Sequence, residues 1–207
     1  MNNKLYFKIV GEKMKYEDIK KPTELLDYMN NNIQYGFVDD KGKIYNSSNE
    51  KEFQNGCRTK WRLSNPKRLL KVKYGHCWDQ VELERFYFKE HNYNFKTIYI
   101  WFELPYDNNY STHTYLVYEE NEKWHYFEHA DFTNKGIYSF DTYEDAINFQ
   151  SQKFIEANKK KKSIERKELD AIRIYEYDTP KYNCNMNEFI NYILETGKEI
   201  KILKNKL

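Results

Sequence analysis

Residues 75–104 read GHCWDQVELERFYFKEHNYNFKTIYIWFEL, and the two halves of this stretch differ in character. After its opening glycine the first half is rich in helix formers and has neither Gly nor Pro, which favours a helix that begins at about Cys77. Residues 97–104 are dominated by β-branched and aromatic side chains, which favours a strand. The sequence therefore predicts a helix that packs next to a sheet.

The flanking sequence has further periodic segments. Helices are expected at residues 23–29, 66–74, 141–157 and 187–196. Strands are expected at residues 97–104, 112–118, 124–127 and 171–177, the middle two forming a hairpin. Helices and strands do not alternate as β-α-β units, so we expect an α+β fold with an antiparallel sheet, in one domain over residues 1–207.

The composition favours a soluble globular protein. The 207 residues carry 34 basic and 32 acidic side chains, and this near balance argues against a dedicated nucleic-acid-binding protein. A mean hydropathy of −1.01 argues against a membrane protein, and the charged N-terminal stretch argues against a signal peptide. Three cysteines are too few for a disulfide framework, so we expect a cytoplasmic protein with reduced thiols.

Cys77 is the cysteine with the strongest case for chemistry. A thiol becomes a good nucleophile when it ionises, and a helix N-terminus or a neighbouring imidazolium favours that ionisation. Cys77 follows the bend at Gly75 and stands at the start of the expected helix, where unpaired backbone N–H groups can hold negative charge. From position alone, a packed cysteine at a tight helix entry explains the sequence equally well.

The hairpin adds a base and an acid. An even-length loop centred between residues 120 and 121 predicts a register in which Tyr118 faces Lys123. The same register sets His113 opposite Glu128, with both side chains on one face. A carboxylate in that place would orient the imidazole and stabilise its cation. Asp131 lies outside this register and is the weaker candidate for the acid.

Three sequence blocks together resemble the transglutaminase-like superfamily. The run GHCWDQ (75–80) is similar to its nucleophile motif Gly-x-Cys-Trp, HTYLVY (113–118) to its histidine strand, and WHYFE (124–128) to the strand that carries its acid. The resemblance covers about residues 61–131. It implies a papain-like core in which the nucleophile helix packs on the sheet, with Cys77 as nucleophile, His113 as base and Glu128 as orienting acid. We expect no cofactor and no metal.

The sequence departs from the family pattern at several positions. Glu128 stands where the family usually has Asp, so either the longer side chain is accommodated or Asp131 takes over. Some papain-like enzymes use a glutamine six residues before the cysteine for the oxyanion, and here that position is Lys71. Transglutaminases use an upstream aromatic region instead, and Trp61 is the residue that we consider for it.

Residues 125–129, HYFEH, also match the inverted zinc-peptidase motif H-x-x-E-H. That motif needs a helix, because one helical turn brings the two histidines close enough to share an ion. The alternating aromatic flanks instead predict a strand, which holds residues four apart at ~13 Å. A zinc metallopeptidase that uses His125, Glu128 and His129 is therefore the less favoured alternative.

We expect a cysteine-dependent enzyme that cleaves a peptide or protein amide through a thioester. Water as the acceptor makes it a thiol protease or amidase, which we prefer because water needs no dedicated site, and an amine makes it a transglutaminase or other acyltransferase. The alternative of another class is a non-catalytic binding module on the same fold. The basic run 159–162 is interpreted as a solvated helix end rather than a site for an anionic partner. The Lys-, Asn- and Tyr-rich composition is typical of an AT-rich bacterial genome.

Overall fold

The computed structural model describes residues 14–103, 110–162 and 172–200. Its helices are α1 (Pro22–Asn32), α2 (Glu50–Thr59), α3 (Pro66–Val72), α4 (Cys77–Glu90), α5 (Tyr143–Lys162) and α6 (Met186–Thr196), with short 3₁₀ turns at Tyr16–Asp18 and Ser47–Asn49. Its strands are β1 (Gln34–Tyr35), β2 (Phe37–Val38), β3 (Ile44–Tyr45), β4 (Tyr74–Gly75), β5 (Asn94–Glu103), β6 (Tyr110–Glu120), β7 (Lys123–Glu128), β8 (Gly136–Phe140), β9 (Ile172–Glu176) and β10 (Lys198–Ile200).

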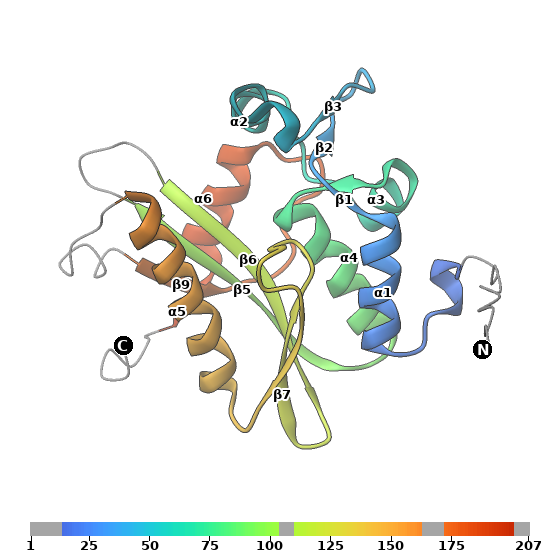
Figure 1. The fold of residues 1–207 in the computed structure, drawn as a ribbon, viewed down its shortest axis with the longest axis vertical. Coiled ribbons are helices and arrows are strands. Elements are labelled where there is room, and N and C mark those ends of the chain that lie inside the picture. The colour runs from blue at the N-terminus through green and yellow to red at the C-terminus, as the bar shows by residue number, and fades with distance from the viewer. Residues whose placement is uncertain (1–13, 104–109, 163–171, 201–207) are drawn as a thin grey trace, which may run out of the picture.

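Six of the strands form one antiparallel sheet in the order β10-β9-β5-β6-β7-β8. α5 covers one face of this sheet, and α4 lies on the other face with α1 beside it (Figure 1). α6 packs against β5 and β9 on the same face as α4. This is the α+β arrangement with an antiparallel sheet that the sequence predicts. Leu104 and Ala171, the outer ends of two predicted strands, and residues 1–13 lie outside the described residues.

Aromatic side chains hold α4 against the sheet. The ring of Phe88, fully buried, has its centroid 4.5 Å from that of Tyr118 and 5.6 Å from that of Phe127. Burial of one such ring contributes about 1.5–3 kcal/mol. On the opposite face, Tyr115 and Tyr126 pack in the cluster formed with α5. The aromatic residues therefore fix α4 relative to the strand that carries the predicted base.

α2 and β8 are not predicted from the sequence, and neither are the strands of two or three residues, β1–β4 and β10. α2 has a largely polar sequence and is started by its cap, where Asn49 Oδ1 accepts a hydrogen bond from Glu52 N at 3.2 Å. β8 is an edge strand of five residues that pairs only with β7 among the described strands. Neither has an apolar period long enough to stand out from the loops around it.

Within the described residues, every helix is too short or too polar to cross a lipid bilayer.

The turn between β6 and β7 is tighter than the sequence predicts. Tyr118 pairs with His125 rather than with Lys123. The loop consists of Asn121 and Glu122 alone, and their φ angles of 53° and 60° are those of a type I′ hairpin turn. The predicted register is therefore wrong by two residues. Because side chains alternate with period two along a strand, a shift of two leaves each of them on its predicted face.

This turn gives a test of the fold. Glu122 adopts a left-handed conformation that glycine reaches without strain, so Glu122→Gly should raise the free energy of unfolding by about 0.5–1 kcal/mol. Urea unfolding measures the change. Asn121→Gly is the matched control, and its free energy of unfolding should rise less, because Asn tolerates the left-handed conformation. A loss of stability in Glu122→Gly would contradict the assigned turn.

Candidate active site

A reciprocal cap fixes the helix that begins at Cys77. His76 is the N-cap residue: its Nδ1 accepts a hydrogen bond from Trp78 N at 3.2 Å, and Asp79 Oδ2 accepts one from His76 N at 3.2 Å. Burial lowers the pKa of His76 to about 3, so the ring is neutral and free to accept. Cys77 therefore occupies the first turn of α4, as predicted, where backbone N–H groups favour an anion.

Gly75 lets α3 approach this first turn. A Cβ atom at position 75 would lie 2.7 Å from Leu69 Cδ1 and 3.0 Å from Asp79 Cβ. A larger residue would require Leu69 or the first turn of α4 to shift, which gives the glycine in GHCWDQ a steric reason.

Asp79 anchors the same turn to the preceding chain. It accepts hydrogen bonds from Trp61 Nε1 at 2.9 Å and from Ser64 N at 2.8 Å. Burial raises the pKa of Asp79 to about 7, although these hydrogen bonds act in the opposite direction. The indole N–H of Trp61, its one polar group, is thus directed at Asp79, and the geometry gives no support to Trp61 as an oxyanion donor. Lys71 is exposed on α3.

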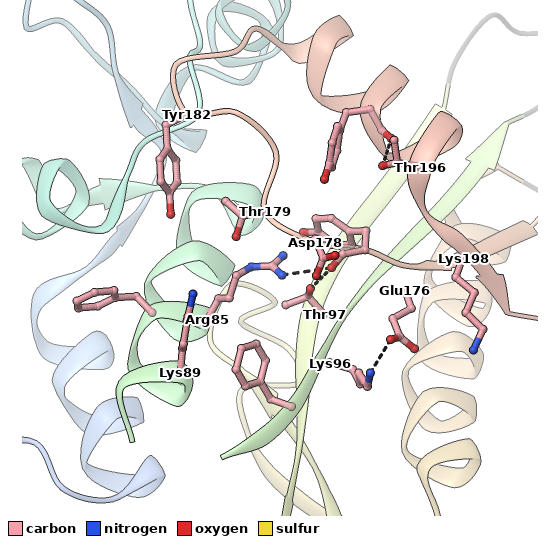
Figure 2. Close-up of a pocket in the computed structure, with 14 residues that line it drawn as sticks. Arg85, Lys89, Lys96, Thr97, Glu176, Asp178, Thr179, Tyr182, Thr196 and Lys198 are labelled. Carbon is pink, nitrogen blue, oxygen red and sulfur yellow. Dashed lines mark hydrogen bonds and ion pairs between the residues drawn. The ribbon is translucent and has the colours of Figure 1, made fainter. Parts of the chain in front are cut away.

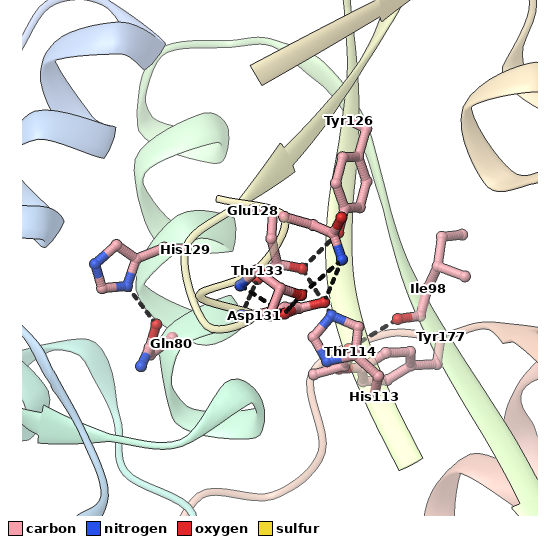
Figure 3. Close-up of polar contacts among 11 residues, drawn as sticks. Gln80, Ile98, His113, Thr114, Tyr126, Glu128, His129, Asp131, Thr133 and Tyr177 are labelled. Atoms are coloured by element: carbon pink, nitrogen blue, oxygen red, sulfur yellow. Dashed lines mark hydrogen bonds and ion pairs between the residues drawn. The ribbon is translucent and has the colours of Figure 1, made fainter. Parts of the chain in front are cut away.

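His113 and Glu128 are in direct contact, although the register differs from the predicted one (Figure 3). Glu128 Oε2 lies 2.7 Å from His113 Nε2, and both side chains are buried. The ladder between β6 and β7 ends at the pair Leu116–Phe127, so the contact is a diagonal one. Diagonal neighbours on a sheet lie about 7–8 Å apart at Cα, a gap that the long Glu side chain closes.

Three donors converge on the Glu128 carboxylate. Besides the imidazole of His113, the hydroxyl of Tyr126 donates to Oε2 at 2.6 Å and Asp131 N donates to Oε1 at 2.8 Å. These contacts fix the position of the carboxylate independently of the imidazole. Tyr126 was not singled out from the sequence, but it stands two residues before Glu128 on β7 and therefore shares its face.

The contacts of Glu128 determine the orientation of His113. Because a carboxylate only accepts hydrogen bonds, Nε2 carries the proton and Nδ1 is left for the thiol of Cys77. Burial disfavours the charged ring, but attraction to Glu128 and hydrogen bonds with Cys77 and Glu128 outweigh it and raise the pKa of His113 well above its ordinary value. A protonated ring beside a sulfur favours the thiolate.

The thiol of Cys77 has a second polar neighbour that the sequence did not indicate. Cys77 is 7% exposed, and the hydroxyl of Tyr35 forms a hydrogen bond with it. The Tyr35 side chain is 43% exposed, yet its hydroxyl is buried, and this burial together with the Cys77 and Cys57 thiols raises its pKa well above the ordinary value. Tyr35 lies near the thiol because β1 pairs with β4, and this pairing sets Tyr35 beside Gly75. No local pattern in the sequence predicts this pairing of two-residue strands.

Asp131 does not contact the imidazole through any hydrogen bond between described residues. Its Oδ1 accepts from Thr133 N at 3.0 Å and from Thr133 Oγ1 at 2.6 Å, and its Oδ2 accepts from Asn134 Nδ2 at 2.8 Å. Its side chain therefore shapes the loop after β7, while its backbone N–H holds Glu128. Of the two acids considered from the sequence, Glu128 is the one at the ring.

Hydrogen bonds of one side chain connect the loop after β7 to α4. Gln80 bridges the two, since its Nε2 donates to Gly75 O at 2.6 Å and its Oε1 lies 2.6 Å from His129 Nδ1 (Figure 3). Burial, and then the charge of Lys135, lower the pKa of His129 to about 3, so the ring is neutral. This bridge brings the end of β7 to the start of α4 and so places Glu128 near the thiol.

The H-x-x-E-H residues do not converge on one point. His125 contacts Ser139 Oγ at 2.9 Å, whereas Glu128 contacts His113 and His129 contacts Gln80. His125 and Glu128 also point to opposite faces of β7, as positions of different parity must. Among the described residues, no three His, Cys, Asp or Glu side chains are grouped so as to hold a metal ion.

Comparison with protein-family models gives no match to this chain. Comparison with curated proteins gives none either.

Proposed function

We propose that this protein is a cysteine-dependent acyl-transfer enzyme with a papain-like, transglutaminase-like core, acting on peptide or protein amides in the cytoplasm. The observation that carries the proposal is the 2.7 Å contact between His113 Nε2 and Glu128, which leaves Nδ1 for a thiol at the start of a helix. All three cysteines are free thiols, in agreement with a reducing compartment.

The acylation step follows from this arrangement. The Cys77 thiolate attacks the amide carbonyl, and an S–C bond forms while the carbonyl oxygen becomes an oxyanion. The protonated imidazole of His113 gives its proton to the leaving amine, the C–N bond breaks, and a thioester remains. Glu128 keeps the ring oriented and stabilises its charge before the transfer.

Two donors are available for the oxyanion. One is the backbone N–H of Cys77, in the first turn of α4. The other is the hydroxyl of Tyr35, which is hydrogen-bonded to the thiol and takes the place considered for Trp61. A phenol with a raised pKa is protonated at neutral pH and therefore able to donate.

Deacylation uses the same base. His113, now neutral, takes a proton from water, the hydroxide attacks the thioester, and the acid and the Cys77 thiol are released. We prefer water as the acceptor because hydrolysis requires no second binding site. An amine in its place makes the protein a transglutaminase or other acyltransferase.

Trapping of the thioester tests the proposal. Glutamine-containing peptides incubated with the full chain, then quenched in acid, should give an acyl adduct on Cys77 by mass spectrometry. An added amine should yield a peptide–amine product only if amine transfer occurs. Cys184→Ala should retain the adduct and Cys77→Ala should lose it. An adduct or product that survives in Cys77→Ala would exclude this mechanism.

A further inference from the structure

A pocket of about 750 Å³ lies along α4, away from its first turn (Figure 2). Its walls come from the middle of α4, the start of β5, the segment that follows β9, and α6 with β10. The volume falls in the range of sites for small organic molecules. Arg85, on its α4 wall, is eight residues after Cys77, or about 12 Å at the rise of an α-helix. The pocket is therefore distinct from the thiol site.

Arg85 is the feature that points to a ligand. It is 9% exposed, and its Nη1 donates to Tyr177 O at 3.2 Å while the guanidinium lies over the Tyr177 ring at 5.1 Å. Nε lies 3.4 Å from Glu82 Oε2, an ion pair without hydrogen-bond geometry. Nη2 is buried and has no hydrogen-bond partner among the described residues. Buried donors are nearly always satisfied, so an arginine that lines a pocket with a free N–H indicates an acceptor that enters it.

The charges around the pocket favour an anion. Cations outnumber carboxylates four to two among the lining residues. Two of these cations are already paired: Lys96 Nζ lies 2.8 Å from Glu176 Oε1, and Arg85 pairs through Nε with Glu82, which stands behind the lining. Asp178 supplies the second carboxylate, while Lys89 and Lys198 stand exposed at the rim, on α4 and β10. An anion would thus meet Arg85 within the pocket and two lysines at its mouth.

The remaining lining favours a flat apolar group. Phe86 and Tyr182 are aromatic residues with large exposed surfaces, and Phe95 and Tyr192 line the pocket with them. Exposed aromatic rings that gather around a concave surface are typical of ligand sites. We propose that this pocket binds a small organic anion, a phosphate or carboxylate joined to an aromatic ring, with the anionic group on Arg85 and the ring against the aromatic lining.

Titration calorimetry of the full chain with four probes tests this proposal. Phenyl phosphate and benzoate carry both features, phenol only the ring, and inorganic phosphate only the charge. At least one of the ring anions should bind with a Kd about tenfold or more below those of phenol and inorganic phosphate. Tighter binding of phenyl phosphate assigns a phosphate ligand, and tighter binding of benzoate assigns a carboxylate. Equal binding of phenol and both ring anions, or no saturable binding of any probe, would overturn the proposal.

Variants locate the site. Arg85→Lys keeps the charge but loses the planar guanidinium group. It should therefore raise the Kd of the ring anion about tenfold and leave the Kd of phenol unchanged. The double variant Lys89→Gln with Lys198→Gln changes only exposed rim residues, and its Kd for the ring anion should rise severalfold. It therefore tests the placement of the ligand even if Arg85→Lys fails to fold. Lys51→Gln, on α2, is the matched control and should have no effect. Unchanged affinity in the double variant would overturn the placement.

Discussion

Iodoacetamide at neutral pH should modify Cys77 about a hundredfold or more faster than Cys57 or Cys184. Burial raises the pKa of Cys57 to about 12 and that of Cys184 to about 11, so both remain thiols at neutral pH. Cys77 has the first turn of α4 and the raised-pKa ring of His113 beside it, and both favour the reactive thiolate.

Cys184 serves as the internal control for this experiment. Cys77 and Cys184 are each 7% exposed, so access alone predicts similar rates for the two thiols. A large difference must then come from ionisation. The rates are obtained by mass spectrometry of peptides from the labelled chain. Slow and equal labelling of all three cysteines would favour a non-catalytic binding module on this fold.

Glu128→Gln should lower the rate of thioester formation about a hundredfold to ten-thousandfold, the usual range for general acid–base catalysis. The substitution keeps the size of the side chain but removes the charge that holds the pKa of His113 high. It also offers the ring an amide that can donate, which permits the wrong tautomer. NMR titration of the His113 ring should show a lower pKa in the variant than in the unaltered chain.

Glu128→Gln should also change how the free energy of unfolding depends on pH. A histidine whose pKa is raised on folding contributes its full stabilisation below the unfolded value, about 6.5, and loses it as pH rises through the folded value. The difference in the free energy of unfolding between the unaltered chain and Glu128→Gln should therefore be largest near about pH 6 and decrease as the pH increases. Asp131→Asn is the control, because in the described part of the chain its side chain accepts hydrogen bonds from the loop residues Thr133 and Asn134 and none from the ring. An equal loss of rate in Asp131→Asn would contradict the assignment of the acid.

Local sequence patterns predicted the parts of the site that depend on short-range rules. The start of α4 follows from the bend at Gly75 and the helix formers after it. The shared face of His113 and Glu128 follows from strand parity, which survives the error of two residues in the register. That error came from the turn, where Glu122 adopts a conformation more typical of glycine and so leaves no turn signal in the sequence.

The observed register also bears on the proposed resemblance to the transglutaminase-like superfamily. Glu128 stands where that family usually has Asp, and here it reaches His113 across a diagonal rather than a direct pair. An Asp at this position would be one methylene shorter and would leave the ring without its 2.7 Å contact. A Glu at position 128 and the register of the hairpin are thus consistent with each other.

Contacts between distant segments could not be predicted from one sequence. Tyr35 reaches the thiol through a pair of two-residue strands, and Gln80 meets His129 only after α4 has docked on the sheet. Arg85 looks like an ordinary polar helix residue until the segment after β9 packs over it. Such contacts depend on tertiary packing, which carries no periodic signal along the chain.

How the alkylation rate of Cys77 varies with pH tests the central claim most directly, since it reports whether the sulfur and the ring form an ion pair. We expect the rate to stay high down to about pH 6 in the unaltered chain and to fall there in His113→Gln. A rate that rises only above about pH 8, with no difference between the two proteins, is the behaviour of an ordinary thiol and would contradict the account.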